Sequence, residues 1–261
     1  MDKILAAAQL IATSRRNRAR LGPLPADIAP QTEADGYRIQ RAVHDLVLPY
    51  AGAMVGYKIG CTSAVMQQYL GIPHPCGGGV FARGVHDSGV ELPAGDFVRV
   101  GVECEIAVRL SRDLPPAQAP FTADSVADAI EAYHPAIEIV DERYVDWQSL
   151  GAPTLVADDF YAAGCVLGKP VLRAAVPDLL AVVGRAIING AEVSRGTGAD
   201  VLGHPHNPLA WLANHLAAEG RGLKAGQIVL TGSLVKTIWL EPGDQVTMEL
   251  SGLGEVRATF A

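Results

Sequence analysis

Val-Arg-Val-Gly-Val-Glu-Cys-Glu-Ile-Ala-Val-Arg-Leu, residues 98–110, is the stretch of sequence that decides the fold. Its β-branched residues, and the turn signal Ser-Arg-Asp-Leu-Pro-Pro that follows, predict a β-strand. Because successive side chains of a strand point to opposite faces, Glu103 and Glu105 share one face and Cys104 lies on the other. Two adjacent carboxylates in an apolar strand repel each other and lose hydration unless a cation lies between them.

A second acidic strand is predicted over residues 135–143, Pro-Ala-Ile-Glu-Ile-Val-Asp-Glu-Arg, in which Glu138 lies between two isoleucines. Three carboxylates in apolar strands indicate a hard divalent cation with oxygen ligands, Mg²⁺ or Mn²⁺. The alternative is a solvent-facing acidic stripe on an antiparallel sheet. We favour the metal site.

The composition is that of a folded globular protein, because 49% of the 261 residues are hydrophobic and only 19% are charged. The net charge of −7 argues against nucleic-acid binding. The basic run at 15–20 is expected to end a first helix and to complement its dipole. No apolar stretch is long enough for a membrane span, and the N-terminus lacks a signal-peptide pattern, so we expect no membrane partner.

The cysteines stand singly, with no Cys-x-x-Cys pair. Their spacing indicates neither a zinc site nor a disulfide framework. It predicts buried free thiols in a cytoplasmic protein.

Two regions are expected along the chain. Helical spacing predicts one helix over 2–18 and a second that starts after Thr32 and is closed by Pro49. Neither helix could bury its apolar face alone, so together they form an N-terminal helical cap over 1–52. Short strands and regular turn signals then predict a β-rich catalytic domain over 53–261. The expected class is α+β: a rolled, mixed β-sandwich or barrel-like core with peripheral helices.

Lys58 lies in a predicted apolar strand over 54–60. It is either a surface lysine with a buried stem or a cation that points into an acidic pocket, where it balances charge or moves a proton. The glycine-rich segment 71–79 predicts a loop suited to a lid or to a close backbone approach to ligand. Further along the chain, Asn189-Gly190 predicts a hairpin turn, and Asn207 is expected to cap a helix.

Five stretches occur in order between residues 56 and 233 and cover most of the chain: Gly56-Tyr57-Lys58-Ile59-Gly60 with Thr62-Ser63; Glu103-Cys104-Glu105; Ala136-Ile137-Glu138-Ile139-Val140-Asp141; Val201-Leu202-Gly203-His204-Pro205 with Trp211-Leu212-Ala213-Asn214; and Gly226-Gln227-Ile228-Val229-Leu230-Thr231-Gly232-Ser233. Each is weak alone, but the ordered set is specific. It resembles the fumarylacetoacetate hydrolase superfamily, and within it the branch of 2-oxopent-4-enoate hydratases and 4-oxalocrotonate decarboxylases of aromatic meta-cleavage pathways. The fold of that superfamily, a mixed β-roll with helices, agrees with the predicted class.

The resemblance implies a metal site and a substrate. Glu103, Glu105 and Glu138 would bind Mg²⁺ or Mn²⁺, and Lys58 would face the substrate. A 2-oxo acid chelates such a metal through its carboxylate and its carbonyl, and the metal polarises that carbonyl as a Lewis acid. Lys58 would offset the added negative charge and move a proton.

Other residues receive expected roles. Asp141 is a second candidate for proton transfer or for orienting a water, and the alternative is a salt bridge to Arg143. Ser233, with Thr231 and the backbone around it, is expected to hold the substrate carboxylate, and Tyr161 is expected to line the pocket.

The chain departs from the family pattern in two stretches that we expect to line the pocket. Cys76-Gly77 stands where an acidic residue and an aromatic are common. Phe160-Tyr161 stands in a segment that commonly reads Asp-Asn-Ala-Ser-Ser from Asp158 onward, so Tyr161 replaces a small hydroxyl residue. The metal chemistry is therefore expected to survive, while these changes point to an unusual 2-oxo acid.

Four hypotheses follow for the activity. The first is a metal-dependent hydratase that converts a 2-hydroxy-2,4-dienoate to a 4-hydroxy-2-oxo acid. The second is a decarboxylase of the same branch, which needs a basic residue at the far end of the pocket. The third is an acylpyruvate hydrolase, which needs a His-Glu pair. The fourth is a catalytically silent subunit in a complex with a related hydratase or decarboxylase. The resemblance also implies a homo-oligomer.

Overall fold

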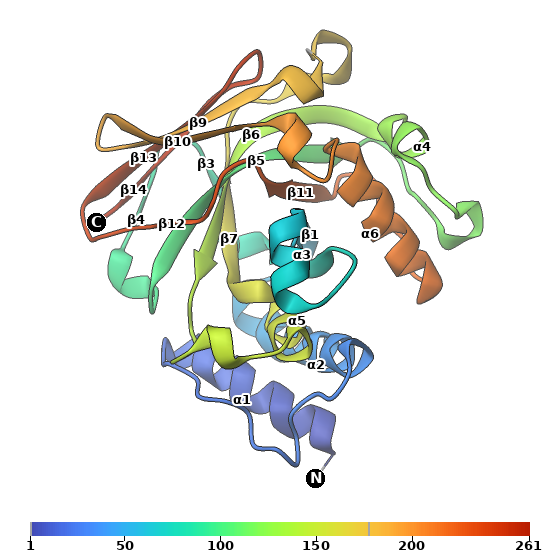
Figure 1. Ribbon diagram of the computed structural model, residues 1–261, viewed down its shortest axis with the longest axis vertical. Coiled ribbons are helices and arrows are strands. Elements are labelled where there is room, and N and C mark those ends of the chain that lie inside the picture. Colours follow the sequence, from blue (N-terminus) through green and yellow to red (C-terminus); the bar gives the residue numbers. More distant parts are fainter. Residues whose placement is uncertain (1, 177) are drawn as a thin grey trace.

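The computed structural model describes residues 2–176 and 178–261 (Figure 1). Its α-helices are α1 (Lys3–Asn17), α2 (Glu33–Ala51), α3 (Ala64–Leu70), α4 (Ala123–Ala127), α5 (Ala152–Ala157) and α6 (His206–Ala218). Its strands are β1 (Met54–Gly60), β2 (Cys76–Phe81), β3 (Val85–Asp87), β4 (Val90–Leu92), β5 (Val100–Leu110), β6 (Ile130–Asp141), β7 (Ala162–Leu167), β8 (Val171–Leu172), β9 (Val183–Ile188), β10 (Ala191–Thr197), β11 (Ile228–Ser233), β12 (Ile238–Trp239), β13 (Asp244–Leu250) and β14 (Gly254–Phe260). Among the described residues, no helix combines the length and the apolar character that crossing a lipid bilayer requires.

The strands form two sheets. The larger is mixed, with the order β2-β1-β11-β5-β6-β7-β3, and β12 and β8 add to its central strands β5 and β6. The smaller has the order β10-β9-β13-β14-β4 and contains the hairpin predicted at Asn189-Gly190, where both residues have positive φ. The fold is therefore α+β with two sheets and no closed barrel, as the first of the two predicted architectures requires.

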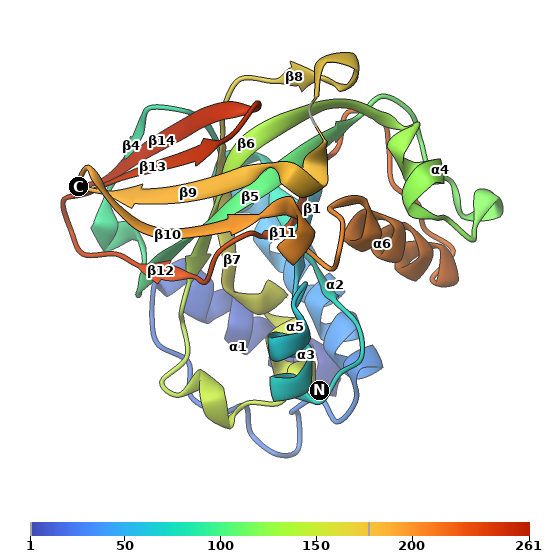
Figure 2. The ribbon, with the colours of Figure 1, turned by 45° about the horizontal axis from the view of Figure 1, so that its top comes forward.

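The two sheets face each other across the main hydrophobic core (Figure 2). Cys104 and Ile137 enter this core from the larger sheet, and Val246 and Met248 enter it from the smaller one. Helix α6 closes one end of the core with Leu209, Leu212, Ala213 and Leu216. Because strand side chains alternate, the opposite face of β5 and β6 points away from this core toward the helices at the other side of the sheet.

The N-terminal helices pack against each other and against α5. Their shared cluster contains Ala8 and Ile11 of α1, Val43 and Val47 of α2, and Ala157 of α5. In Figure 1 these helices lie together, away from the smaller sheet. The apolar faces that could not be buried by one helix alone are buried in this cluster. Because α5 also belongs to it, the division into a cap over 1–52 and a domain over 53–261 stays a prediction.

Three local predictions were wrong. Pro49 does not close α2, which continues to Ala51, because a proline in the last turn removes only one intrahelical hydrogen bond. Asn207 does not cap α6: the helix begins at His206 with Pro205 as N-cap, and the Asn207 side chain donates to the Leu202 carbonyl. The segment 71–79 is not a lid, because Cys76–Phe81 is a buried strand paired with β1.

The glycines of β2 allow close approach of side chains rather than movement. A Cβ atom on Gly78 would lie 3.0 Å from Cβ of Asp159, and one on Gly79 would lie 2.9 Å from the His44 ring. The second distance is shorter than real Cβ contacts show and the first is tighter than most, so glycine at both positions lets these two side chains lie close against the strand.

Gly56 on β1 is expected to be essential for the pairing that places Lys58. A Cβ atom at this position would lie 2.0 Å from the Ile228 carbonyl oxygen on β11, which is backbone and cannot move aside. We expect Gly56→Ala to lower the free energy of unfolding by about 3 kcal/mol, measured by urea denaturation. Gly22→Ala is the control, because a Cβ atom there meets nothing within 4 Å. Equal effects at the two positions would contradict the expectation.

Candidate metal centre and active site

Three carboxylates converge on one face of the larger sheet. Glu103 lies directly opposite Glu138 in the antiparallel β5–β6 pair, and Glu105 is two residues further along β5 on the same face. One ligand oxygen from each lies within 4.8 Å of the other two. Like charges placed opposite each other on neighbouring strands are destabilising, so this arrangement is typical of a cation site. The strand alternation predicted from residues 98–110 is confirmed, with Cys104 in the core behind the cluster.

Some of the carboxylate oxygens are held and others are free. The backbone N–H of Gly232 donates to Glu105 Oε2 at 2.9 Å, and the Thr237 hydroxyl donates to Glu103. The other Glu105 oxygen and Glu138 Oε2 are buried without a hydrogen-bond partner among the described residues. Buried polar atoms almost always have a partner. The free oxygens therefore fit a hard divalent cation between the three residues.

Lys58 belongs to this cluster. Its side chain is 5% exposed, and Nζ lies 2.9 Å from Glu138 Oε1. Burial would lower the pKa of the ammonium, but the charges of Glu138, Glu103 and Glu105 outweigh burial and raise it. Lys58 is therefore a buried, charged lysine and not a surface lysine.

The acidic cluster strains the metal-free protein. Burial, followed by repulsion from Glu138, raises the pKa of Glu103 to about 7. Burial and the charges of Glu138 and Glu103 also raise the pKa of Glu105 well above its usual value. Ionising all three groups without a cation therefore costs free energy.

We expect the metal-free protein to lose stability as the pH rises from about 4.5 to 7. In this range Glu103 stays protonated in the native state but ionises in the unfolded chain, so the native state binds more protons and the slope of stability against pH is negative. The contribution of Glu103 to this loss is about 3 kcal/mol, and that contribution levels off above pH 7. Thermal unfolding of chelator-treated protein at pH 5 and pH 8 measures it, and Glu103→Gln should flatten the difference. A melting temperature that rises toward pH 8 in the wild type would contradict this account.

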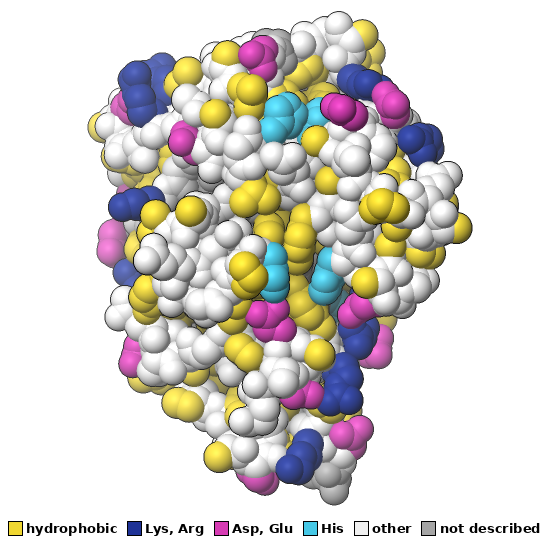
Figure 3. All heavy atoms as spheres, turned by 45° about the vertical axis from the view of Figure 1, so that its right-hand side comes forward, with side chains coloured by type: hydrophobic (Ala, Val, Ile, Leu, Met, Phe, Trp, Pro, Cys, Tyr) yellow, Lys and Arg dark blue, Asp and Glu magenta, His cyan; other side chains and the backbone are white. Residues whose placement is uncertain are grey.

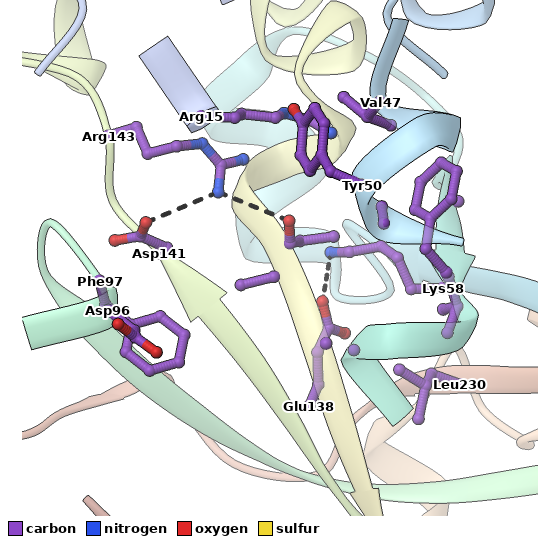
Figure 4. A pocket seen from close by; sticks show the side chains of 18 residues that line it. Arg15, Val47, Tyr50, Lys58, Asp96, Phe97, Glu138, Asp141, Arg143 and Leu230 are labelled. Carbon is purple, nitrogen blue, oxygen red and sulfur yellow. Dashed lines mark hydrogen bonds and ion pairs between the residues drawn. The ribbon is translucent and has the colours of Figure 1, made fainter. Parts of the chain in front are cut away.

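A cavity of about 200 Å³ adjoins the cluster (Figure 4). Lys58 and Glu138 form part of its wall, and Arg15, Arg143 and Asp141 form another part. Apolar groups from α2, from the segment before β5 and from β11 complete the lining, among them Val47, Tyr50, Phe97 and Leu230. A small organic acid fits in this volume, with its polar end near the carboxylates and its hydrocarbon part against the apolar lining.

Asp141, the second catalytic candidate, lines the same cavity but its oxygens are engaged. Oδ1 accepts hydrogen bonds from the backbone N–H groups of Val98 and Arg99 at 2.8 and 2.9 Å. Oδ2 lies 3.9 Å from the Arg143 guanidinium. This geometry anchors the start of β5, so proton transfer by Asp141 stays a prediction.

The three predicted substrate-binding side chains lie in different surroundings. The Thr231 hydroxyl donates to the Ile106 carbonyl at 2.7 Å, and the Ser233 hydroxyl donates to the Val235 carbonyl at the same distance. Tyr161 packs against Tyr144 and Trp147, and its buried hydroxyl has no partner among the described residues. Substrate binding by these residues stays a prediction. The backbone N–H of Gly232, between Thr231 and Ser233, contacts Glu105 of the acidic cluster.

Sequence reasoning missed the ion network beside the cavity. Arg15 of α1 contacts Asp158 at 2.6 Å and Asp159 at 3.0 Å. Arg143 contacts Asp158 at 3.1 Å, and His44 of α2 contacts Asp159 at 2.8 Å. The run at 15–20 was assigned to the helix dipole alone, and nothing in the sequence brings residue 15 to residues 158 and 159.

Cys76 stands where the family pattern commonly has an acidic residue, and its side chain is neutral. Contact with the Cys61 thiol, followed by burial, raises the pKa of Cys76, so the thiol stays protonated. All four cysteines are free and buried, as predicted.

A second hollow lies on another face of the molecule. Figure 3 shows a hollow with histidine and hydrophobic side chains around it. The residues that line the second hollow are Glu33, Tyr37, His74, Trp211, His215 and Glu219. Trp211 and His215 stack with ring centroids 5.1 Å apart, so their faces are occupied by each other. Of the described residues, only the three glutamates on β5 and β6 form a group that could hold a metal ion.

The sequence of residues 81–261 matches the fumarylacetoacetate (FAA) hydrolase C-terminal family, and the chain belongs to this family. It is 36% identical over its whole length to 98% of a 2-keto-4-pentenoate hydratase of Paraburkholderia phymatum. It is 34% identical, over 94% of its length and 92% of the relative, to a 2-hydroxyhexa-2,4-dienoate hydratase of Comamonas testosteroni.

A solved structure has the same fold throughout. The 4-oxalocrotonate decarboxylase from Pseudomonas putida G7, complexed with magnesium and adipate, superposes with a TM-score of 0.93 at 28% identity. The match covers 100% of this chain and 98% of the decarboxylase. The resemblance inferred from the ordered motifs is thus confirmed, including the branch that joins hydratases and decarboxylases.

Proposed function

We propose that the chain is a divalent-metal-dependent hydratase that converts a 2-hydroxy-2,4-dienoate to a 4-hydroxy-2-oxo acid. The observation that carries this proposal is the buried convergence of Glu103, Glu105 and Glu138 beside the ammonium of Lys58. Relatives that match nearly the whole chain at 33–38% identity are named as hydratases of such substrates, which supports the same reaction.

The charges and ligand types fit Mg²⁺ or Mn²⁺. Three carboxylates and one ammonium leave a net charge of about −2 when all are ionised, which a divalent cation neutralises. Oxygen ligands suit both metals, so we propose either one. When bound, such a metal supplies a Lewis acid that polarises the carbonyl of a 2-oxo acid.

The side chains of the protein bind, orient and protonate the substrate in this proposal. Lys58 reaches the same point as the glutamates and offsets the negative charge that develops on the substrate's C2 oxygen. Its ammonium is an ionisable proton donor in direct contact with the cluster, so we assign it the proton delivered during ketonisation. The apolar wall formed by Val47, Phe97 and Leu230 excludes water from the hydrocarbon part of the substrate.

The pairing of the cations in the cavity favours a substrate with one carboxylate. Lys58 is paired with Glu138, and Arg15 and Arg143 are paired with Asp158 and Asp159. Among the described lining residues, no further lysine or arginine is free to hold a second carboxylate. Decarboxylation of a diacid is the second candidate, because the decarboxylase structure matches the whole chain. That reaction needs a free basic residue for the second carboxylate, and the described lining of this cavity offers none.

The direct test uses metal-stripped protein with Mg²⁺ or Mn²⁺ added back. We expect metal-dependent loss of the ultraviolet absorbance of 2-hydroxypenta-2,4-dienoate without release of CO₂. Release of CO₂ from 2-oxohex-3-enedioate would replace the hydratase with the decarboxylase. Metal binding without turnover of either substrate would indicate a silent subunit.

We also propose a homo-oligomer in the cytoplasm. The four free, buried thiols suit a reducing compartment. Light scattering of the purified protein gives its mass, and co-purification from cells tests a complex with a related hydratase or decarboxylase subunit.

A further inference from the structure

The backbone between α5 and β7 adopts an unusual conformation. Asp159, Phe160 and Tyr161 have φ angles of 52°, 48° and 65°. Three successive non-glycine residues in the left-handed region are rare, because each places its Cβ close to its own backbone. Such a turn persists only where surrounding contacts hold it, and strain of this kind concentrates at functional sites.

Buried ion pairs supply those contacts. We call the group formed by Arg15, His44, Arg143, Asp158 and Asp159 the carboxylate clamp. Both carboxylates are 1% exposed. The backbone N–H of Gly79 also donates to Asp159 at 3.0 Å. Two carboxylates without these partners would be buried and uncompensated, so the clamp holds the first residues of the strained turn.

The middle residue of the turn lies against the candidate active site. A Cβ atom on Gly60 would lie 3.9 Å from Cβ of Phe160 and 3.3 Å from Nζ of Lys58. Phe160 and the Lys58 ammonium therefore border the same small space at the end of β1. The Phe160 side chain thus begins within 4 Å of the point at Gly60 that the Lys58 ammonium also approaches.

We propose that Arg15 is a positioning residue for the active site. It acts from the N-terminal helix α1 through Asp158 and Asp159, which hold the turn, and through Phe160, which confines Lys58. The N-terminal cap is then part of the catalytic machinery and not only a cover over the apolar face of α5. The activity measured below rests on the proposed hydratase function.

The test compares Arg15→Met, Arg15→Lys and the matched control Arg16→Met. Arg16 neighbours Arg15 on the same helix and is exposed. We expect Arg15→Met to lower kcat at least tenfold with less than a threefold change in KM, and Arg15→Lys to recover part of the loss. Arg16→Met should equal the wild type, and all three should keep the wild-type affinity for Mn²⁺. An unchanged kcat per folded molecule in Arg15→Met would overturn the proposal.

Two further measurements separate this proposal from other failures. Phe160→Leu keeps every charged group of the clamp and keeps an apolar side chain in the buried cluster around Phe160, but it changes the side chain beside Lys58. It should therefore lower kcat in the same direction even where Arg15→Met does not fold. An unchanged kcat in Phe160→Leu would also overturn the proposal. If the wild type turns over no dienoate, the hydratase proposal fails on its own. Calorimetry of oxalate with the Mn²⁺-loaded protein then decides. Oxalate is a planar chelating dianion whose second carboxylate stands in for the negative charge that develops on the C2 oxygen, and not for the neutral carbonyl of the substrate, so its affinity should follow kcat rather than KM. Arg15→Met should bind oxalate at least fivefold more weakly than Arg16→Met, and equal affinities would refute the positioning role.

Discussion

Replacing Glu105 by glutamine is expected to raise the stability of the metal-free protein while abolishing metal-dependent turnover. At pH 8 the substitution removes a buried carboxyl whose ionisation is opposed by burial and by the other two carboxylates, so the melting temperature without metal should rise by a few degrees, or about 1 kcal/mol. The amide oxygen still accepts the hydrogen bond from Gly232, so the local fold is kept. Loss of an ionised ligand should weaken Mn²⁺ binding strongly and lower kcat/KM roughly 10³-fold.

The two effects of Glu105→Gln have opposite signs, and this separates a ligand from an ordinary buried carboxylate. Glu131→Gln is the matched control, because Glu131 lies on β6 but is exposed at the far end from Glu138. It should leave stability, Mn²⁺ affinity and turnover at wild-type values. Calorimetric scans with and without Mn²⁺ measure the stability, and a titration measures the affinity. A destabilised metal-free Glu105→Gln variant that still binds Mn²⁺ would exclude Glu105 as a ligand.

The acidic cluster was predictable because its geometry is local. The alternation of a strand fixes which side Glu103 and Glu105 share, whatever the rest of the fold does. Glu138 lies in a second apolar strand, and pairing of the two strands places it opposite Glu103. Lys58 was a weaker inference, because its burial depends on β11, which separates β1 from β5.

The carboxylate clamp was not predictable because its geometry is non-local. Arg15 and Asp158 are 143 residues apart in the sequence, and their contact depends on how α1, α2 and α5 pack. The glycines of β2 were predicted to form a loop because their role also depends on distant residues. Because these glycines have no side chain, Asp159 and His44, which are distant in the sequence, can lie against the strand. A glycine that is needed for close approach has the same sequence signature as one that is needed for a turn.

Lys58→Met is expected to lower kcat roughly 10³-fold while leaving Mn²⁺ binding intact or stronger. The ammonium is an ionisable proton donor in direct contact with Glu138, and methionine fills similar volume without charge. Since Lys58 pairs with Glu138 and competes with a cation for its oxygens, its removal should not weaken the metal site.

The size and charge of Lys58 can be separated by two further variants. Lys58→Arg keeps the charge, but its planar guanidinium is larger than an ammonium and does not give up a proton, so we expect less than a tenth of the wild-type kcat. Lys169→Met removes an exposed lysine and should behave as the wild type. Steady-state kinetics with saturating Mn²⁺, together with a direct Mn²⁺ titration of each variant, distinguish loss of the proton donor from loss of the metal. Wild-type kcat in Lys58→Met would show that the proton comes from elsewhere, and Asp141, on the same cavity wall, would become the first residue to replace.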